Sequence, residues 1–168
     1  MSDSGFEVRL ALARDRLAEV GRTLGRAGPW PLAARFDHAP EAAWGPRETL
    51  AHLGEMLPYW LGEAERLIEM TDSPAPFGRE ATNEVRLTII ERDRTLPLRE
   101  LVARVANGID RWSARWPELD EAQRQRSGLH PTLGNVTVTQ VATRFVAKHL
   151  EDHLDQLAAV AAVEPGGA

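Results

Sequence analysis

The segment from His149 to His153 places two imidazole side chains four residues apart. In a helix, residues at this spacing project from the same face with Cβ atoms about 6 Å apart, so both rings can reach one cation. We expect this face to point to the core, because its other members are apolar: Val138, Val141, Phe145, Leu157 and Val160. An imidazole at a core position needs a polar partner. A hydrogen bond from each ring to a carbonyl or carboxylate is the alternative to a metal, and this spacing alone does not decide between them.

A third histidine strengthens the metal interpretation. His52 lies in the apolar first half of the segment that follows Pro46, and helical bundles build metal sites from side chains on facing helices. Three neutral imidazoles leave two or three coordination positions open, which is typical of reactive rather than structural sites. The sequence therefore predicts one divalent-metal site formed by His52, His149 and His153.

Other polar residues have weaker claims to the site. Glu55 follows His52 by three residues, so it is a candidate catalytic residue that orients a ligand or accepts a proton; a solvated helix carboxylate is the alternative. Asp152 is a candidate hydrogen-bond partner of a ligating imidazole, with exposure as the alternative. His130 could border the mouth of the site, although a loop histidine is more often solvated. Neither it nor His38 is predicted as a ligand.

Apolar residues recur at steps of three and four over four stretches, the period of amphipathic helices. We expect these helices at residues 6–25, 46–70, 98–116 and 137–163, the last opened by a capping box at Thr137-Val-Thr-Gln140. Residues 79–94 have a helical period but are polar, so a short helix within a long crossover is predicted there. Residues 117–136, rich in proline and glycine, are expected to form a loop, and no strand is predicted. The fold class is thus all-α, a four-helix bundle forming one domain over residues 1–168.

Composition narrows the classes of function. The chain has 168 residues, 43% hydrophobic and 27% charged, which suits one folded domain. It contains no cysteine, which excludes disulfides, thiolate ligands and a cysteine nucleophile. The net charge of -5 gives no basic footprint for nucleic acid. Because neither a signal peptide nor a run of roughly 18 apolar residues is present, we expect a cytoplasmic protein without membrane contact.

Three runs resemble the DinB-like family, also called the DinB/bacillithiol-transferase-like superfamily, in order along most of the chain. They are WGPRETLAHLGEMLPYW, HPTLGNVTVTQ and VAKHLEDHLDQL. The resemblance implies a four-helix bundle with an up-up-down-down path and a long crossover. It also implies a three-histidine site for zinc, nickel, iron or manganese at one end of the bundle, and a homodimer.

The resemblance further implies a metal-dependent transferase that uses bacillithiol, mycothiol or glutathione, with a small-molecule thiol and an electrophile as partners. Metal-assisted hydrolysis is a variant on the same site. A non-catalytic bundle, in which the ion joins two helices or is stored, is the alternative. The two classes differ in one observable feature, because an enzyme needs a cavity that opens onto the metal and a structural site should be closed.

Overall fold

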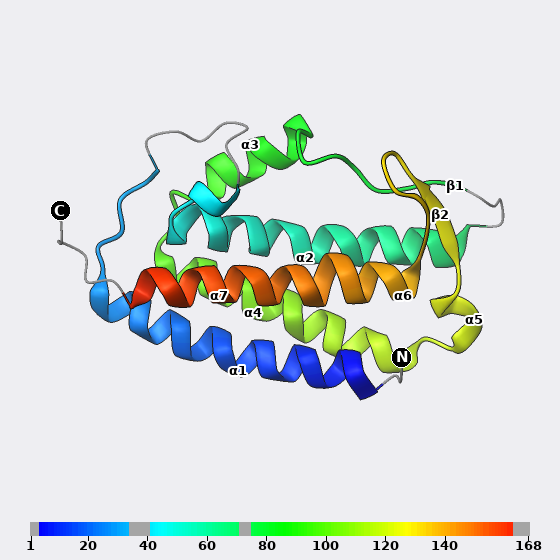
Figure 1. Ribbon diagram of the computed structural model, residues 1–168, viewed down its shortest axis with the longest axis horizontal. Coiled ribbons are helices and arrows are strands. Elements are labelled where there is room, and N and C mark those ends of the chain that lie inside the picture. The colour runs from blue at the N-terminus through cyan, green and yellow to red at the C-terminus, as the bar shows by residue number, and fades with distance from the viewer. Residues whose placement is uncertain (1–3, 34–40, 71–74, 163–168) are drawn as a thin grey trace.

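Four long helices lie side by side in the computed structural model, which describes residues 4–33, 41–70 and 75–162 (Figure 1). The first three are α1 (Ser4–Ala27), α2 (Pro46–Glu69) and α4 (Leu98–Arg115). The fourth is continuous through α6 (Val138–Gln140), the π-helical stretch η3 (Val141–Lys148) and α7 (His149–Ala161). The predicted four-helix bundle is confirmed, and the capping box of Thr137 and Gln140 opens its last helix.

The helices α1 and α7 run in one direction, and α2 and α4 run in the other (Figure 1). The segment after α1 folds back over the end of that helix, where the Trp30 indole donates to the Leu24 carbonyl at 2.9 Å. The Ala33 amide then donates to Glu48 in the first turn of α2 at 2.9 Å, so α2 departs from the end at which α1 finishes. The path is therefore up-down-down-up, where the resemblance implied up-up-down-down.

The expected long crossover joins the parallel helices α2 and α4. It contains the short strand β1 (Ala75–Pro76) and the predicted additional helix, α3 (Glu84–Asp93). The Asn83 side chain caps α3 by accepting from the Arg86 amide at 3.0 Å. The crossover passes along the outside of the bundle, beside α2 (Figure 1).

The prediction of a plain loop over residues 117–136 is wrong. This segment forms η2 (Trp116–Glu118), α5 (Glu121–Arg124), and a hairpin of β2 (Ser127–His130) and β3 (Gly134–Thr137). The hairpin joins β1 in a three-stranded sheet of order β1-β2-β3, in which β1 and β2 are parallel and β2 and β3 antiparallel. Such short strands show no period of two, and β1 is distant in sequence, so the pairing leaves no local pattern.

The apolar core fixes α2 against α7. Six leucines of these two helices are at most 1% exposed: Leu50, Leu53, Leu57, Leu150, Leu154 and Leu157. Their burial holds the two helices in register, which is the main source of helical stability in a bundle. Among the described residues, no helix combines the length and apolar character needed to cross a membrane.

Candidate metal centre

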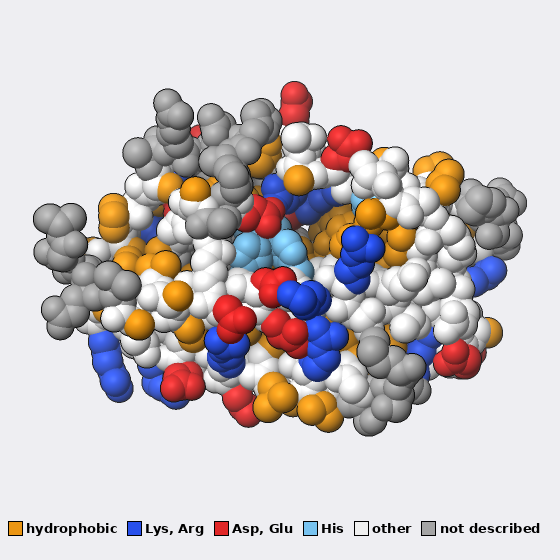
Figure 2. All heavy atoms as spheres, in the orientation of Figure 1, with side chains coloured by type: hydrophobic (Ala, Val, Ile, Leu, Met, Phe, Trp, Pro, Cys, Tyr) orange, Lys and Arg blue, Asp and Glu red, His pale blue; other side chains and the backbone are white. Residues whose placement is uncertain are grey.

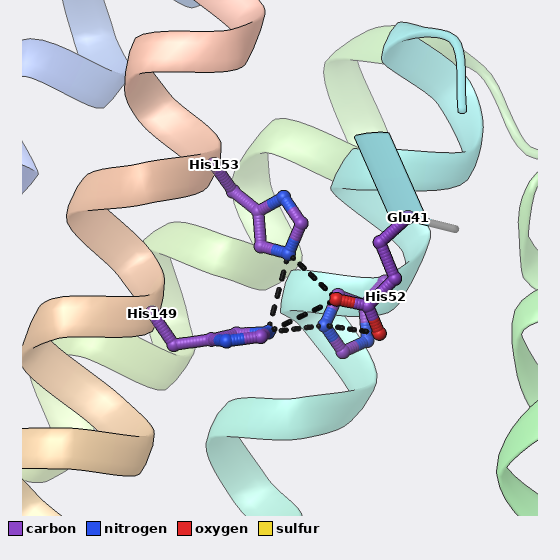
Figure 3. Close-up of side chains that lie close together, drawn as sticks. All are labelled: Glu41, His52, His149 and His153. Carbon is purple, nitrogen blue, oxygen red and sulfur yellow. Dashed lines mark hydrogen bonds and ion pairs between the residues drawn. The ribbon is translucent and has the colours of Figure 1, made fainter. Parts of the chain in front are cut away.

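The three predicted histidines come together between α2 and α7 (Figure 3). His52 Nε2 lies 2.8 Å from His149 Nε2, and that atom lies 3.2 Å from His153 Nε2. A tetrahedral centre with metal–nitrogen bonds of about 2.1 Å would separate its nitrogens by about 3.4 Å. The nitrogens thus already occupy positions close to those of a ligand set for one divalent ion.

A carboxylate that the sequence analysis missed completes the group. Glu41, on the short 3₁₀ helix η1 (Glu41–Ala43), lies 3.3 Å from His153 Nε2, 3.6 Å from His149 Nε2 and 3.7 Å from His52 Nε2. One ligand atom from each of the four residues lies within 4.8 Å of the others. Arg86 of α3 forms an ion pair with the same carboxylate. Glu41 lies on the connection before α2, where no helical period assigns a side chain to a face.

Burial and charge set the protonation states of these groups. Burial lowers the pKa of His52 well below its ordinary value, and burial together with the charge of His153 lowers that of His149 to about 4. Burial alone would raise the pKa of Glu41. A hydrogen bond to His153 and the nearby positive groups outweigh it and lower that pKa to about 2. Near neutral pH the site therefore holds uncharged His52 and His149 rings beside an ionised carboxylate.

The side chain of Gln156 fixes the tautomer of His153. Its Oε1 lies 2.9 Å from His153 Nδ1, and because a carboxamide oxygen only accepts, Nδ1 carries the proton. The other ring nitrogen, Nε2, then faces His149 and Glu41. The Gln156 amide nitrogen donates to the carbonyls of Glu41 at 3.0 Å and Trp44 at 3.2 Å, which sets the orientation of the amide.

His52 has the opposite tautomer in the absence of a metal. Its Nδ1 lies 3.3 Å from Arg86 Nη2, and a guanidinium only donates, so the His52 proton lies on Nε2 and points to His149. A cation bound at His52 Nε2 would displace this proton to Nδ1, so the ring would change tautomer and its contact with Arg86 would have to rearrange. With that displacement, the three nitrogens would suit a divalent ion that prefers nitrogen and oxygen ligands, and the Glu41 carboxylate would lie beside it.

The sequence predicts that Phe145 points to the core, but the structure leaves it only partly buried at the edge of the core. The π-helical stretch explains this difference. A π-helix closes its hydrogen bonds over five residues instead of four, which shifts the phase of the apolar stripe. The buried positions of this stretch are accordingly Ala142, Val146 and Ala147. Phe145 and His149 instead line a cavity.

This cavity has a volume of about 480 Å³ and opens beside the histidines. His149 is 35% exposed in its side chain, and Figure 2 shows histidine side chains at the bottom of a hollow flanked by hydrophobic atoms. Besides the candidate ligands Glu41, His52 and His149, the wall includes Met56, Trp60, Arg79, Arg86, His130 and Phe145. The candidate metal centre is therefore accessible to small molecules from one side.

His130 is buried, contrary to the expectation of a solvated loop histidine, because the β2–β3 hairpin packs it against Trp60 and Phe145. Burial lowers its pKa, and a hydrogen bond to the backbone of Arg79 only partly offsets this. Gly78, at φ 78°, passes so close that a Cβ there would lie 2.5 Å from His130 Cδ2. His130 lines the cavity but does not belong to the four-residue cluster.

Glu55 is buried, so the interpretation as a solvated carboxylate is wrong, but it also lies outside the cluster. Both of its oxygens accept from Arg79 Nη2, at 2.6 and 2.5 Å, and its catalytic role stays a prediction. Asp152 is exposed and paired with Lys148, which leaves it no contact with the imidazoles. His38 lies outside the described residues.

The fold and the cluster define a helical-bundle protein with a candidate histidine-rich metal centre. Residues 10–157 match the family model of the DinB superfamily, and the chain belongs to that superfamily. Among solved structures it is similar to YfiT from Bacillus subtilis, described as a probable metal-dependent hydrolase with an unusual four-helix bundle topology. The two share 15% identity with a TM-score of 0.73, over 95% of this chain and 87% of YfiT, which shows a common fold. No curated protein sequence matches the chain significantly.

Proposed function

We propose that this protein is a divalent-metal-dependent enzyme, and that it is a transferase for a low-molecular-weight thiol. One observation carries the proposal. The histidine nitrogens that lie close together are beside a cavity of about 480 Å³, whose wall includes His52 and His149. An ion that only joined α2 to α7 would need no such opening. The access to His149 therefore favours an enzyme over the non-catalytic alternative.

The ion, of zinc, nickel, iron or manganese, would supply Lewis acidity that lowers the pKa of a thiol or of water. Glu41 is ionised and can accept the proton that the nucleophile loses, while Arg86 holds its carboxylate in place. Met56, Trp60 and Phe145 offer an apolar wall to the electrophile. Because the chain contains no cysteine, the thiol must come from a small molecule such as bacillithiol, mycothiol or glutathione.

Two finer points accompany this proposal. Such thiols are kept reduced in the cytoplasm, so a thiol transferase suits a cytoplasmic location. Glu55 contacts Arg79 instead of the histidines, and we assign it a positioning role for that arginine.

Hydrolysis is the second candidate, favoured by the Glu41 carboxylate at 3.3–3.7 Å from the three nitrogens. A carboxylate beside a metal site can take the proton of an attacking water. The description of YfiT as a probable metal-dependent hydrolase agrees with this candidate.

The test begins with elemental analysis of protein purified without a histidine tag, followed by reloading with each of the four metals. Conjugation of 1-chloro-2,4-dinitrobenzene is then measured with bacillithiol, mycothiol and glutathione, and hydrolysis of p-nitrophenyl esters without any thiol. We expect metal-dependent and thiol-dependent conjugation. Ester hydrolysis without thiol supports the second candidate instead, and a protein that never holds stoichiometric metal refutes both.

Glu41→Gln separates the chemistry from metal binding. The amide keeps the shape of the side chain but cannot take a proton, so turnover should fall roughly 100-fold or more while the three histidines still hold the ion. Full turnover in this variant would exclude Glu41 as the base.

A further inference from the structure

Arg79 is held in the cavity wall by contacts that use only part of its guanidinium. One nitrogen, Nη2, donates to both oxygens of Glu55, and the guanidinium carbon lies 3.6 Å from the centre of the Tyr59 ring. Among the described residues, no hydrogen-bond partner is found for the Nε and Nη1 hydrogens. The side chain is only 11% exposed, and it lines the same cavity as His52 and His149.

The Nε and Nη1 atoms are not fully buried, so their hydrogens are free to donate to an acceptor that reaches them. The planar group pairs best with a carboxylate, which accepts two parallel hydrogen bonds. Glu55 and Tyr59 restrain the guanidinium through the ion pair and the ring contact. It is therefore preorganised for an acceptor that enters from the cavity.

The charges around the cavity favour an anion once a metal is present. Arg86 is neutralised by Glu41 and Arg79 by Glu55, and the exposed Glu80 lies at the rim. A divalent ion adds two positive charges to this nearly balanced set, so the filled cavity attracts a negatively charged ligand.

Flat rings form the wall on which the body of such a ligand would rest. Phe145 stacks on Trp60 with centroids 4.6 Å apart and on His130 with centroids 5.5 Å apart, at interplanar angles of 15° and 16°. Met56 continues the apolar surface. An apolar or aromatic group can pack there while a charged end reaches the arginine.

We propose that the substrate that reacts at the metal centre is a small organic carboxylate, whose carboxylate Arg79 binds while its apolar body packs on Trp60 and Phe145. The proposal rests on the proposed function, because it places the reacting group of the substrate at the histidines. Glu55 sets the affinity by competing with the ligand for the same guanidinium.

The experiment compares 3-phenylpropanoate with its uncharged isostere 3-phenylpropanamide, both titrated calorimetrically into zinc-loaded protein. The carboxylate should bind at least tenfold more tightly than the amide. Arg79→Gln should bring the two affinities within about twofold of each other. Glu55→Gln should act in the opposite direction and tighten carboxylate binding, because it frees Arg79. If the Arg79–Glu55 ion pair is only structural, its loss should weaken binding in both variants.

Arg115→Gln is the matched control, because Arg115 makes a two-point ion pair with Glu65 outside the cavity and should leave both affinities unchanged. The double variant Arg79→Gln/Glu55→Gln retains an uncharged, hydrogen-bonding pair, so it tests Arg79 without leaving a buried carboxylate unpaired. It too should not prefer the carboxylate.

A carboxylate preference that survives in both Arg79 variants but disappears in His149→Ala would place the anion on the metal and overturn the proposal. Tighter binding in Arg79→Gln or weaker binding in Glu55→Gln would also overturn it. Zinc content is measured on the same samples. Failure to take up zinc refutes the proposed function, whereas stoichiometric zinc without carboxylate preference refutes only the anion site.

Discussion

Gln156 Oε1 accepts a hydrogen bond from His153 Nδ1 at 2.9 Å, and its amide nitrogen donates one to the Glu41 carbonyl at 3.0 Å. One side chain thus orients a candidate ligand and connects it to the segment that carries the candidate base. Partners of this kind fix the tautomer and ring orientation of ligating histidines.

Gln156→Leu should therefore weaken zinc affinity about 10- to 100-fold without unfolding the protein, because His153 loses the acceptor that fixes its tautomer. Competition with a chelating dye measures the affinity. Gln156→Glu keeps an acceptor for His153 Nδ1, so its zinc affinity should be closer to that of the unmodified protein. Equal affinities in all three proteins would show that His153 needs no such partner.

Replacing a candidate ligand and replacing its neighbour in the core should have different effects. Leu150 is fully buried, so Leu150→Ala should lower the free energy of unfolding by about 2–5 kcal/mol. His149→Ala should abolish stoichiometric metal binding and leave the stability of the metal-free protein within about 1 kcal/mol, because its side chain is partly exposed. Urea unfolding in EDTA and elemental analysis measure the two effects. If the His149→Ala variant is unfolded and the unmodified protein contains no metal, the histidines have a structural role and do not bind a metal.

The metal-free protein should lose stability as the pH falls. The pKa of His149 is about 4 in the folded chain against an ordinary value of 6.5, so between these values the unfolded chain binds a proton that the folded chain does not. The lowered pKa of His52 acts in the same direction, starting below pH 6.5. The contribution of Glu41 is present above its ordinary 4.5 and is lost as the pH falls toward 2.

Urea unfolding in EDTA at several pH values from 7.5 to 5 checks this dependence. The free energy of unfolding should decrease over that range, and the decrease should be smaller in His149→Ala. A stability that rises on acidification, or the same slope in the variant, would contradict the neutral state of this imidazole.

Gly78→Ala should destabilise the protein and disturb the cavity wall. Its φ of 78° costs a residue with a side chain about 1–2 kcal/mol, and the added Cβ would lie 2.5 Å from His130. Gly62 in α2 is the matched control, because a Cβ there meets nothing within 4 Å. Gly62→Ala should stabilise the helix by about 0.5–1 kcal/mol. Thermal unfolding of both variants tests the contrast. An equal change in stability in the two variants would show that the crossover can rearrange at Gly78 without cost.

Self-association stays a prediction. A two-fold dimer is the commonest closed assembly, and it is what the family resemblance implies. Sedimentation equilibrium at micromolar concentration should give the mass of two chains. The mass of a single chain would exclude a stable homodimer.

Features that lie on regular helices could be predicted from the sequence. His52, His149 and His153 lie on α2 and α7, where the apolar period indicates which face points inward, and the structure brings these rings together. Glu41 and Arg79 lie on connections, whose side chains are placed by tertiary contacts that leave no periodic signal. The same holds for the β2–β3 hairpin, which depends on a distant strand.

Phe145 shows a different limit. Its assignment to the core assumed an α-helical period through the last helix, and the π-helical stretch shifts that period. The amino-acid composition of this stretch does not distinguish the two helix types.

Most of the candidate metal ligands and the residue proposed to bind the substrate's carboxylate belong to different parts of the chain. Three of the four possible ligands are on bundle helices, whereas Arg79 is on the crossover and His130 on the hairpin, both outside the four-helix core (Figure 1). The exposed positions of these outer segments can therefore change during evolution at little cost to folding, because surface segments tolerate sequence change better than packed helices. Descendants of one ancestral bundle could in this way keep the same inorganic chemistry and diverge in the molecules to which they apply it.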